Sequence, residues 1–160
     1  IGELAREQKE MGLGIVSTVQ FSHATPAAFS SHNVNRGNYG EIAHEIYDEL
    51  RDAPAAVAIP VSNGTTLAGI TKGFQSLYRR GKTSRIPRMV AGSAYGKNPI
   101  VHSFLRGYDQ CRDLDPKMVR ETEVNEPLIN WHSIDGGLAL NAIRETGGWA
   151  GYAWRPRSTS

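Results

Sequence analysis

Apolar residues in this chain form either short continuous runs or stripes at helical spacing. The run AAVAIPV at residues 55–61 ends in the small polar cluster SNGTT, and Leu67, Ile70 and Phe74 then recur at helical spacing. Such a run is typical of a parallel strand buried on both faces, and the stripe after it is typical of an amphipathic helix. The centre of the chain is therefore predicted to be a strand, a tight loop and a helix.

The same alternation continues on both sides of this unit. Further strands are expected at 13–19, 89–94 and 149–154, and further helices at 2–11, 39–50, 99–106 and 133–146. The helix at 39–50 is expected to pack against the strand that begins at Ala55. The pattern predicts an α/β fold: a three-layer sandwich with a small, mostly parallel sheet of about four strands flanked by helices. Residues 1–154 would form one domain, and 155–160 a disordered tail.

The polar loop after the central strand is the first candidate for chemistry. It consists of Ser62, Asn63, Gly64, Thr65 and Thr66. A loop of small residues before a helix directs several backbone N–H groups and the positive end of the helix dipole at one point, which suits a phosphate. It would also lie at the carboxyl end of a strand, where parallel sheets bind ligands. The alternative is an ordinary turn in which a Thr or Asn side chain caps the helix.

A second polar group precedes the last helix. Asp135, Gly136 and Gly137 could form another anion-binding loop, or Ser133 and Asp135 could cap that helix. At the helix at 99–106, Asn98 is a possible cap and Pro99 suits the first helical position.

Composition narrows the class of partner. The chain has 160 residues and a net charge of +2, and no basic stripe alternates with aromatic residues, so nucleic acid is not expected. No apolar run approaches the roughly 18 residues of a membrane span, and no signal peptide is visible, so we expect a cytoplasmic protein without membrane contact. The single cysteine, Cys111, allows no internal disulfide. A phosphate-bearing small molecule is the expected partner.

Three stretches within about 47–151 resemble one known family. IPVSNGTTLAGITKGF, RIPRMVAGSAYGKNPIV and ALNAIRETGGWA resemble, in this order, segments of threonine synthase and its relatives among the fold-type II pyridoxal-phosphate enzymes. The resemblance implies that the chain binds pyridoxal phosphate. The cofactor phosphate would be held through backbone N–H groups and hydroxyls of Ser62, Asn63, Gly64, Thr65 and Thr66. An active chain would be a pyridoxal-phosphate-dependent lyase of the threonine synthase type.

The family's Schiff-base lysine has no counterpart here. That lysine lies in a Ser-x-Lys segment upstream of the phosphate loop, and none of the lysines of this chain has such a context: Lys9, Lys72, Lys82, Lys97 and Lys117. We therefore expect non-covalent binding of the cofactor without full catalytic activity.

Residues 12–45 resemble a different family. The segment GLGIVSTVQFSHATPAAFSSHNVNRGNYGEIAHEI is similar to the part of alkaline phosphatases that carries an Ala-Thr-Pro motif and a later arginine. By this resemblance Thr25 would ligate magnesium, His23 would lie near the metal, and Arg36 would clamp a substrate phosphate. Thr25 alone would be a weak magnesium ligand, and the histidines show no zinc-binding spacing. The alternative is that His23 and Thr25 form a turn and a helix cap and that Arg36 is a solvated loop residue.

Together the two resemblances indicate a chimera of segments 1–46 and 47–154, joined between Gly40 and Tyr47. Two alternative functions follow. One is a non-catalytic recombinant domain that forms homo-oligomers, because the parent folds would cover surfaces left exposed here. The other is a fragment of an alkaline phosphatase-related, metal-dependent phosphomonoester hydrolase.

Overall fold

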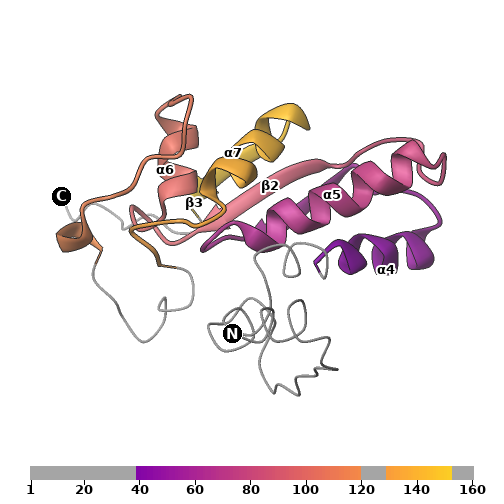
Figure 1. Ribbon diagram of the computed structural model, residues 1–160, viewed down its shortest axis with the longest axis horizontal. Helices are drawn as coiled ribbons and strands as arrows, with labels where there is room; N and C mark the ends of the chain where they lie inside the picture. The colour runs from indigo at the N-terminus through magenta and orange to yellow at the C-terminus, as the bar shows by residue number, and fades with distance from the viewer. Residues whose placement is uncertain (1–38, 120–128, 153–160) are drawn as a thin grey trace, which may run out of the picture.

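The computed structural model describes residues 39–119 and 129–152. Its strands form one parallel sheet in the order β1-β2-β3: β1 Ala56–Pro60, β2 Arg88–Ser93 and β3 Trp149–Tyr152. Its helices are α4 Gly40–Leu50, α5 Thr65–Arg79, α6 Pro99–Leu105 and α7 Gly136–Glu145, with a 3-10 turn η1 at Pro116–Met118 (Figure 1). The predicted α/β fold with a small parallel sheet flanked by helices is confirmed.

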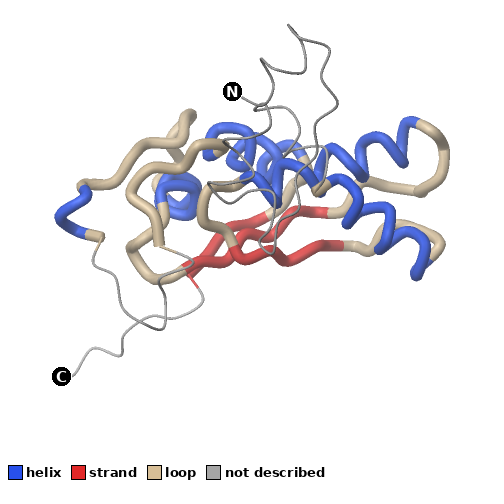
Figure 2. The backbone as a smooth tube through the Cα atoms, turned by 60° about the horizontal axis from the view of Figure 1, so that its bottom comes forward, coloured by secondary structure: helices blue, strands red, loops and turns tan. Residues whose placement is uncertain are grey.

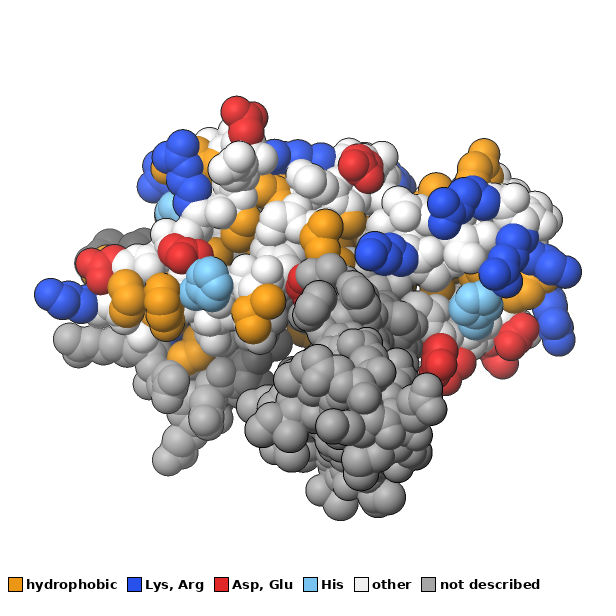
Figure 3. Space-filling view, viewed as in Figure 1, with side chains coloured by type: hydrophobic (Ala, Val, Ile, Leu, Met, Phe, Trp, Pro, Cys, Tyr) orange, Lys and Arg blue, Asp and Glu red, His pale blue; other side chains and the backbone are white. Residues whose placement is uncertain are grey.

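The predictions for residues 2–11, 13–19 and 155–160 lie outside the described residues. The described residues contribute three strands, and about four were expected for the sheet. None of the helices in the described ranges is both long and apolar enough to cross a bilayer. On the face shown in Figure 3, basic side chains are interspersed with acidic ones.

Local signals account for the start of α6. The Asn98 side chain accepts hydrogen bonds from the N–H groups of Ile100 and Val101, and Pro99 occupies the first helical position of α6, as predicted. Helix α7 begins at Gly136, three residues later than predicted. After the C-terminal end of α7 the backbone turns at Gly147, whose φ of +62° lies in the left-handed region.

The hydrophobic core lies on one face of the sheet. Ile59, Met89, Ala91 and Ala150 are buried there against α5, α6 and α7. Figure 2 shows most of the helical turns on one side of the strands. The core residues supplied by the helices include Leu67, Ile70, Phe74, Ile100, Val101, Ala139 and Ile143.

The prediction that the strand at 55–61 is buried on both faces is wrong. Burial alternates along β1, and Ala56, Ala58 and Pro60 are exposed on the face opposite the core. A continuous apolar run is compatible with burial on either one or two faces, because small residues such as alanine are tolerated at exposed positions. The run therefore located the strand but did not determine what covers it.

Helix α4 packs against α5, and the predicted packing of this helix on the strand at Ala55 is wrong. Gly40 and Ala43 of α4 approach Gly73 of α5 so closely that a Cβ atom on Gly73 would lie 2.5 Å from Gly40 O and 2.7 Å from Ala43 Cβ. The helical stripe of α4 identifies its buried face. Only the small residues on the facing helix decide where that face packs.

We predict that Gly73→Ala destabilises the fold by about 1–3 kcal/mol, because the added methyl group overpacks the α4–α5 contact. The matched control is Gly137→Ala in α7, where an added Cβ would meet nothing within 4 Å. That variant should stabilise the fold by about 0.5–1 kcal/mol, the usual gain for this exchange in a helix. Urea denaturation of both variants measures the difference, and equal effects would contradict the packing argument.

Candidate functional site

The loop between β1 and α5 lies at the carboxyl ends of the parallel strands. Val61 continues the ladder beyond β1, because its N–H donates to Gly92 O at 2.8 Å. Residues 62–64 then lead directly into α5. The loop contacts the last residue of β2, the first turn of α6 and the segment before α7. Three helix starts therefore converge on it.

Three consecutive backbone carbonyls in and before this loop are held by donors from other elements. Val61 O accepts from Ser93 Oγ at 2.9 Å and from Asn98 Nδ2 at 3.1 Å. Ser62 O accepts from Asn98 Nδ2 at 3.0 Å and from Ser133 Oγ at 2.9 Å. Asn63 O accepts from the N–H of Asp135 at 3.0 Å. Each of these peptide groups is thereby fixed in orientation.

The orientation of the carbonyls determines that of the N–H groups. In a trans peptide the N–H of one residue points away from the carbonyl of the residue before it. The N–H groups of Ser62, Asn63 and Gly64 therefore point away from the carbonyls' partners. The N–H groups of Thr65 and Thr66 belong to the first turn of α5, where no intrahelical acceptor exists. Within the described residues none of these five groups donates a hydrogen bond to another residue.

The capping alternative for this loop is wrong in the described residues. No side chain caps α5. The Asn63 side chain instead accepts from Asn130 Nδ2 at 2.6 Å. Since no Thr or Asn oxygen caps the helix, its N–H groups and its dipole are left for an external acceptor.

Gly64 allows the loop to sit against α7. Its φ is +87°, and a Cβ there would lie 2.8 Å from Ala139 Cβ, 3.0 Å from Asp135 O and 3.0 Å from Ile100 Cδ1. A side chain at this position would be strained by its backbone conformation and would also collide with α6 and α7. The loop therefore passes this point only as glycine, and the small residues present fit a phosphate cradle.

The segment at 129–135 was not predicted to contact the loop. Asn130, Ser133 and Asp135 all bond to residues 62–63, although each lies about 70 positions further along the chain. The predicted capping role of Ser133 is wrong, because Asp135 holds the N-cap position and no side chain caps α7; the Ser133 hydroxyl donates to Ser62 O. Asp135 occupies the N-cap position of α7 without a side-chain cap bond. None of these three contacts between residues 130–135 and the loop is marked by a periodic pattern in the sequence.

Cys111, beside the start of α7, and Tyr152, at the end of β3, favour their neutral forms. Burial raises the pKa of the Cys111 thiol, which packs beside Gly136 at the start of α7. Burial also raises the pKa of Tyr152, whose ring centroid lies 5.2 Å from that of Tyr95 at the end of the sheet.

An exposed histidine–carboxylate pair lies in the segment before α7. His132 Nδ1 is 2.9 Å from both carboxylate oxygens of Asp113. Among the described residues no group of three metal-binding side chains is present.

The other predicted site residues are distributed as follows. His23, Thr25, Arg36 and Lys9 lie outside the described residues. Lys72, Lys82 and Lys117 are exposed, whereas Lys97 is half-buried and its carbonyl accepts from the N–H of Asn130 at 2.9 Å. Of the predicted site residues in the described ranges, the structure therefore brings the five loop residues together.

Comparison with known proteins agrees with this geometry. A family model described as "Pyridoxal-phosphate dependent enzyme" matches residues 2–153. The threonine synthases of Methanocaldococcus jannaschii and Methanosarcina acetivorans are each 33% identical to the chain over 110 residues, 68% of this chain and 26% of those proteins. The chain thus spans about a quarter of the length of these relatives. The predicted likeness to threonine synthase is confirmed.

A shorter match concerns the other resemblance. Alkaline phosphatase 3 of Bacillus subtilis is 33% identical over 60 residues, which is 38% of this chain and 13% of that protein. The predicted chimera stays a prediction, because this match is short. The family model, by contrast, covers nearly the whole chain. The loop at the carboxyl end of β1, whose five N–H groups have no partner in the described residues, lies within the region that this model matches, and the chain belongs to the family of pyridoxal-phosphate dependent enzymes.

Proposed function

We propose that this chain is a phosphate-binding α/β domain related to threonine synthase, which holds the phosphate of pyridoxal phosphate in the loop at 62–66. One observation carries the proposal: the carbonyls of Val61, Ser62 and Asn63 are all bonded to the protein body, and five neighbouring N–H groups have no partner in the described residues. An array of fixed N–H donors at a helix N-terminus binds an anion without first having to be ordered.

The loop residues would divide the work of binding. The backbone N–H groups of Ser62, Asn63 and Gly64 would donate to the phosphate oxygens together with those of Thr65 and Thr66, and the α5 dipole would favour the negative charge. The half-buried hydroxyls of Thr65 and Thr66 could add donors. When bound, pyridoxal phosphate supplies an electron-withdrawing ring that stabilises negative charge on a substrate carbon.

We propose that the cofactor is held without a covalent bond and that lyase activity of the threonine synthase type is incomplete. Lys72, Lys82 and Lys117 are exposed, and none of the lysines in the chain has the family's Ser-x-Lys context. Binding through the phosphate does not require such a lysine. The proposal therefore separates anchoring of a phosphate-bearing molecule from its chemical conversion.

We predict that Thr66→Asp weakens binding of inorganic phosphate and of pyridoxal phosphate by about tenfold or more, because it places a carboxylate beside the bound anion. An acidic residue in the first turn should stabilise α5 by about 0.3–1 kcal/mol, so the loss would not reflect unfolding. Binding is measured by isothermal titration calorimetry and by the shift in melting temperature with each ligand.

The control for this prediction is Ser76→Asp, which adds the same charge near the other end of α5. It should leave the affinity for both ligands unchanged. Unchanged affinity in Thr66→Asp would contradict the proposed site, as would an unmodified chain that binds neither ligand.

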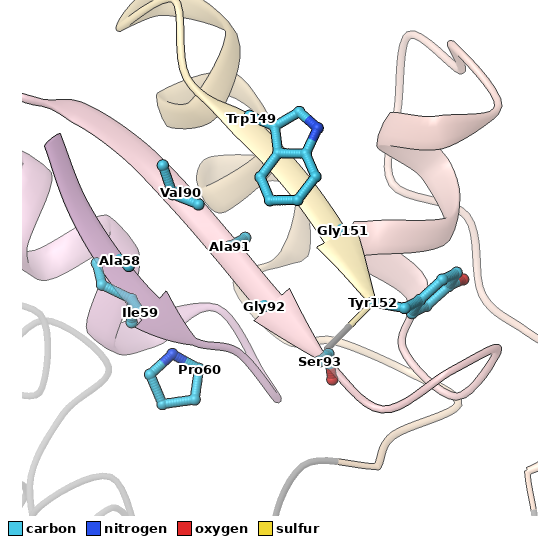
Figure 4. Close-up of a pocket in the computed structure, with 10 residues that line it drawn as sticks. All are labelled: Ala58, Ile59, Pro60, Val90, Ala91, Gly92, Ser93, Trp149, Gly151 and Tyr152. Atoms are coloured by element: carbon cyan, nitrogen blue, oxygen red, sulfur yellow. The ribbon is translucent and has the colours of Figure 1, made fainter. Parts of the chain in front are cut away.

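A second candidate function is self-association through the sheet face opposite the core. Ala58, Pro60 and Trp149 are exposed on this face, and they line a hollow of about 280 Å³ together with Val90 and Gly92 (Figure 4). Trp149 is 57% exposed, and its indole ring lies over Gly151. An apolar sheet face of this kind favours burial against a second copy of the chain, which would give a homo-oligomer without catalytic function.

We predict that Trp149→Arg shifts the chain toward the monomer in sedimentation velocity runs over a range of concentrations, because the charged side chain opposes burial of this face. Leu105→Arg is the matched control, since Leu105 is 52% exposed on α6 away from the hollow. A monomer at all concentrations for the unmodified chain would exclude this candidate.

The short match to an alkaline phosphatase supports a third candidate, a metal-dependent phosphomonoester hydrolase that uses Thr25, His23 and Arg36. On this proposal the chain hydrolyses p-nitrophenyl phosphate only with added magnesium or zinc, and Arg36→Ala abolishes turnover because the substrate phosphate loses its bidentate clamp. Thr66→Asp should leave this activity unchanged, which distinguishes the candidate from the first. Metal-independent turnover, or none, would exclude it.

A further inference from the structure

Asn98 is a fully buried amide that uses its whole hydrogen-bonding capacity. Its Oδ1 accepts from the N–H groups of Ile100 at 3.0 Å and Val101 at 3.2 Å. Its Nδ2 donates to Val61 O at 3.1 Å and to Ser62 O at 3.0 Å. Two lone-pair positions and two N–H groups are all that an asparagine side chain offers. One residue therefore caps α6 and holds two peptides of the loop.

The cap alone does not explain an asparagine at this position. Serine, threonine and aspartate cap helices about as well, because only an acceptor is needed. None of them can donate two N–H groups at once. The donor half of Asn98 is directed entirely to the loop, and the loop is therefore the feature that requires the amide.

We propose that Asn98 is the positioning residue of the phosphate site, an inference that rests on the proposed function. Its Nδ2 fixes the carbonyls of Val61 and Ser62, and through the trans peptide geometry it directs the N–H groups of Ser62 and Asn63 toward the ligand. Ser93 and Ser133 each add a second donor to one of these carbonyls, but among the described residues only Asn98 bridges both. Asn98 does not touch the ligand in this scheme; it acts through the loop backbone.

Asn98→Asp separates the two roles of this residue. The carboxylate keeps an acceptor for the α6 cap but presents an anionic oxygen, in place of two N–H donors, to the carbonyls of Val61 and Ser62. Repulsion between these oxygens should rotate the two peptides. We expect affinity for inorganic phosphate and for pyridoxal phosphate to fall about tenfold or more, as for the loss of one to two charge-assisted hydrogen bonds.

Amide-resolved NMR of the full chain supplies the readout that a purely structural role would not alter. In the unmodified chain the amides of residues 62–66 should shift on addition of phosphate. In Asn98→Asp this response should need about tenfold more phosphate or greater, as for the affinity. The amides of Ile100 and Val101 should keep their protection from hydrogen exchange because the cap remains. Ser103→Ala is the matched control. It removes a buried hydroxyl of α6 that accepts from Arg112 N–H and hydrogen-bonds with the Cys111 side chain, with no bond to residues 61–63, and it should leave phosphate binding unchanged.

Ser133→Ala provides a second test should Asn98→Asp fail to fold. It removes one of the two donors on Ser62 O and leaves the α6 cap intact, and the affinity for phosphate should fall about two- to fivefold. A folded Asn98→Asp chain, or a Ser133→Ala chain, that binds phosphate like the unmodified protein with the same amide shifts would overturn the inference.

Failure of the proposed function is distinguishable from failure of this inference. If the unmodified chain shows no response to phosphate, the proposed function is wrong. Hydrogen exchange of the Ser62 and Asn63 amides without ligand then still decides the role of Asn98. Faster exchange of these two amides in Asn98→Asp than in the unmodified chain would support Asn98 as the residue that orders the loop. Equal exchange in the two chains would contradict that role.

Discussion

The orientation of two peptide groups, 61–62 and 62–63, is the constraint on which the site depends. Their carbonyls accept from the buried amide of Asn98 and from the hydroxyls of Ser93 and Ser133. A planar trans peptide cannot turn its carbonyl inward without turning its N–H outward. The positions of the donors inside the protein thus define the direction of the N–H groups of Ser62 and Asn63, and the proposed anion site relies on this backbone orientation.

Close backbone packing keeps these donors in place. Gly64 lies against the starts of α6 and α7, and a Cβ at Gly148, just before β3, would lie 2.0 Å from Met89 O in β2. Such contacts allow the strands and helices to approach until short side chains such as Ser93 and Ser133 can reach the loop. Longer spacing between the elements would have required longer and more mobile side chains, which lose more entropy when they are ordered.

The geometry explains how a phosphate could be anchored, and it assigns no chemical step to the loop residues. Backbone N–H groups bind and orient an anion, but they neither accept protons nor attack a substrate. The chain spans about a quarter of the threonine synthases to which it is similar. On the proposed function, anchoring and conversion are separable at the level of residues: a local strand, loop and helix would hold the phosphate, and no step of the conversion is assigned to them.

What the sequence determined by itself was local. The stripe in GEIAHEIYDEL predicted α4, and the pair Asn98-Pro99 predicted the start of α6, because caps and amphipathic spacing act within one or two helical turns. The position of the loop at 62–66 followed from an apolar run ending in SNGTT. Tertiary structure alone decided that α4 packs on α5, that β1 is buried on one face, and that Asn63 pairs with Asn130, 67 residues away. The physical reason is that periodicity records which side of an element is apolar, whereas the partner of that side, and of each polar group in the loop, is set by residues that only folding brings near.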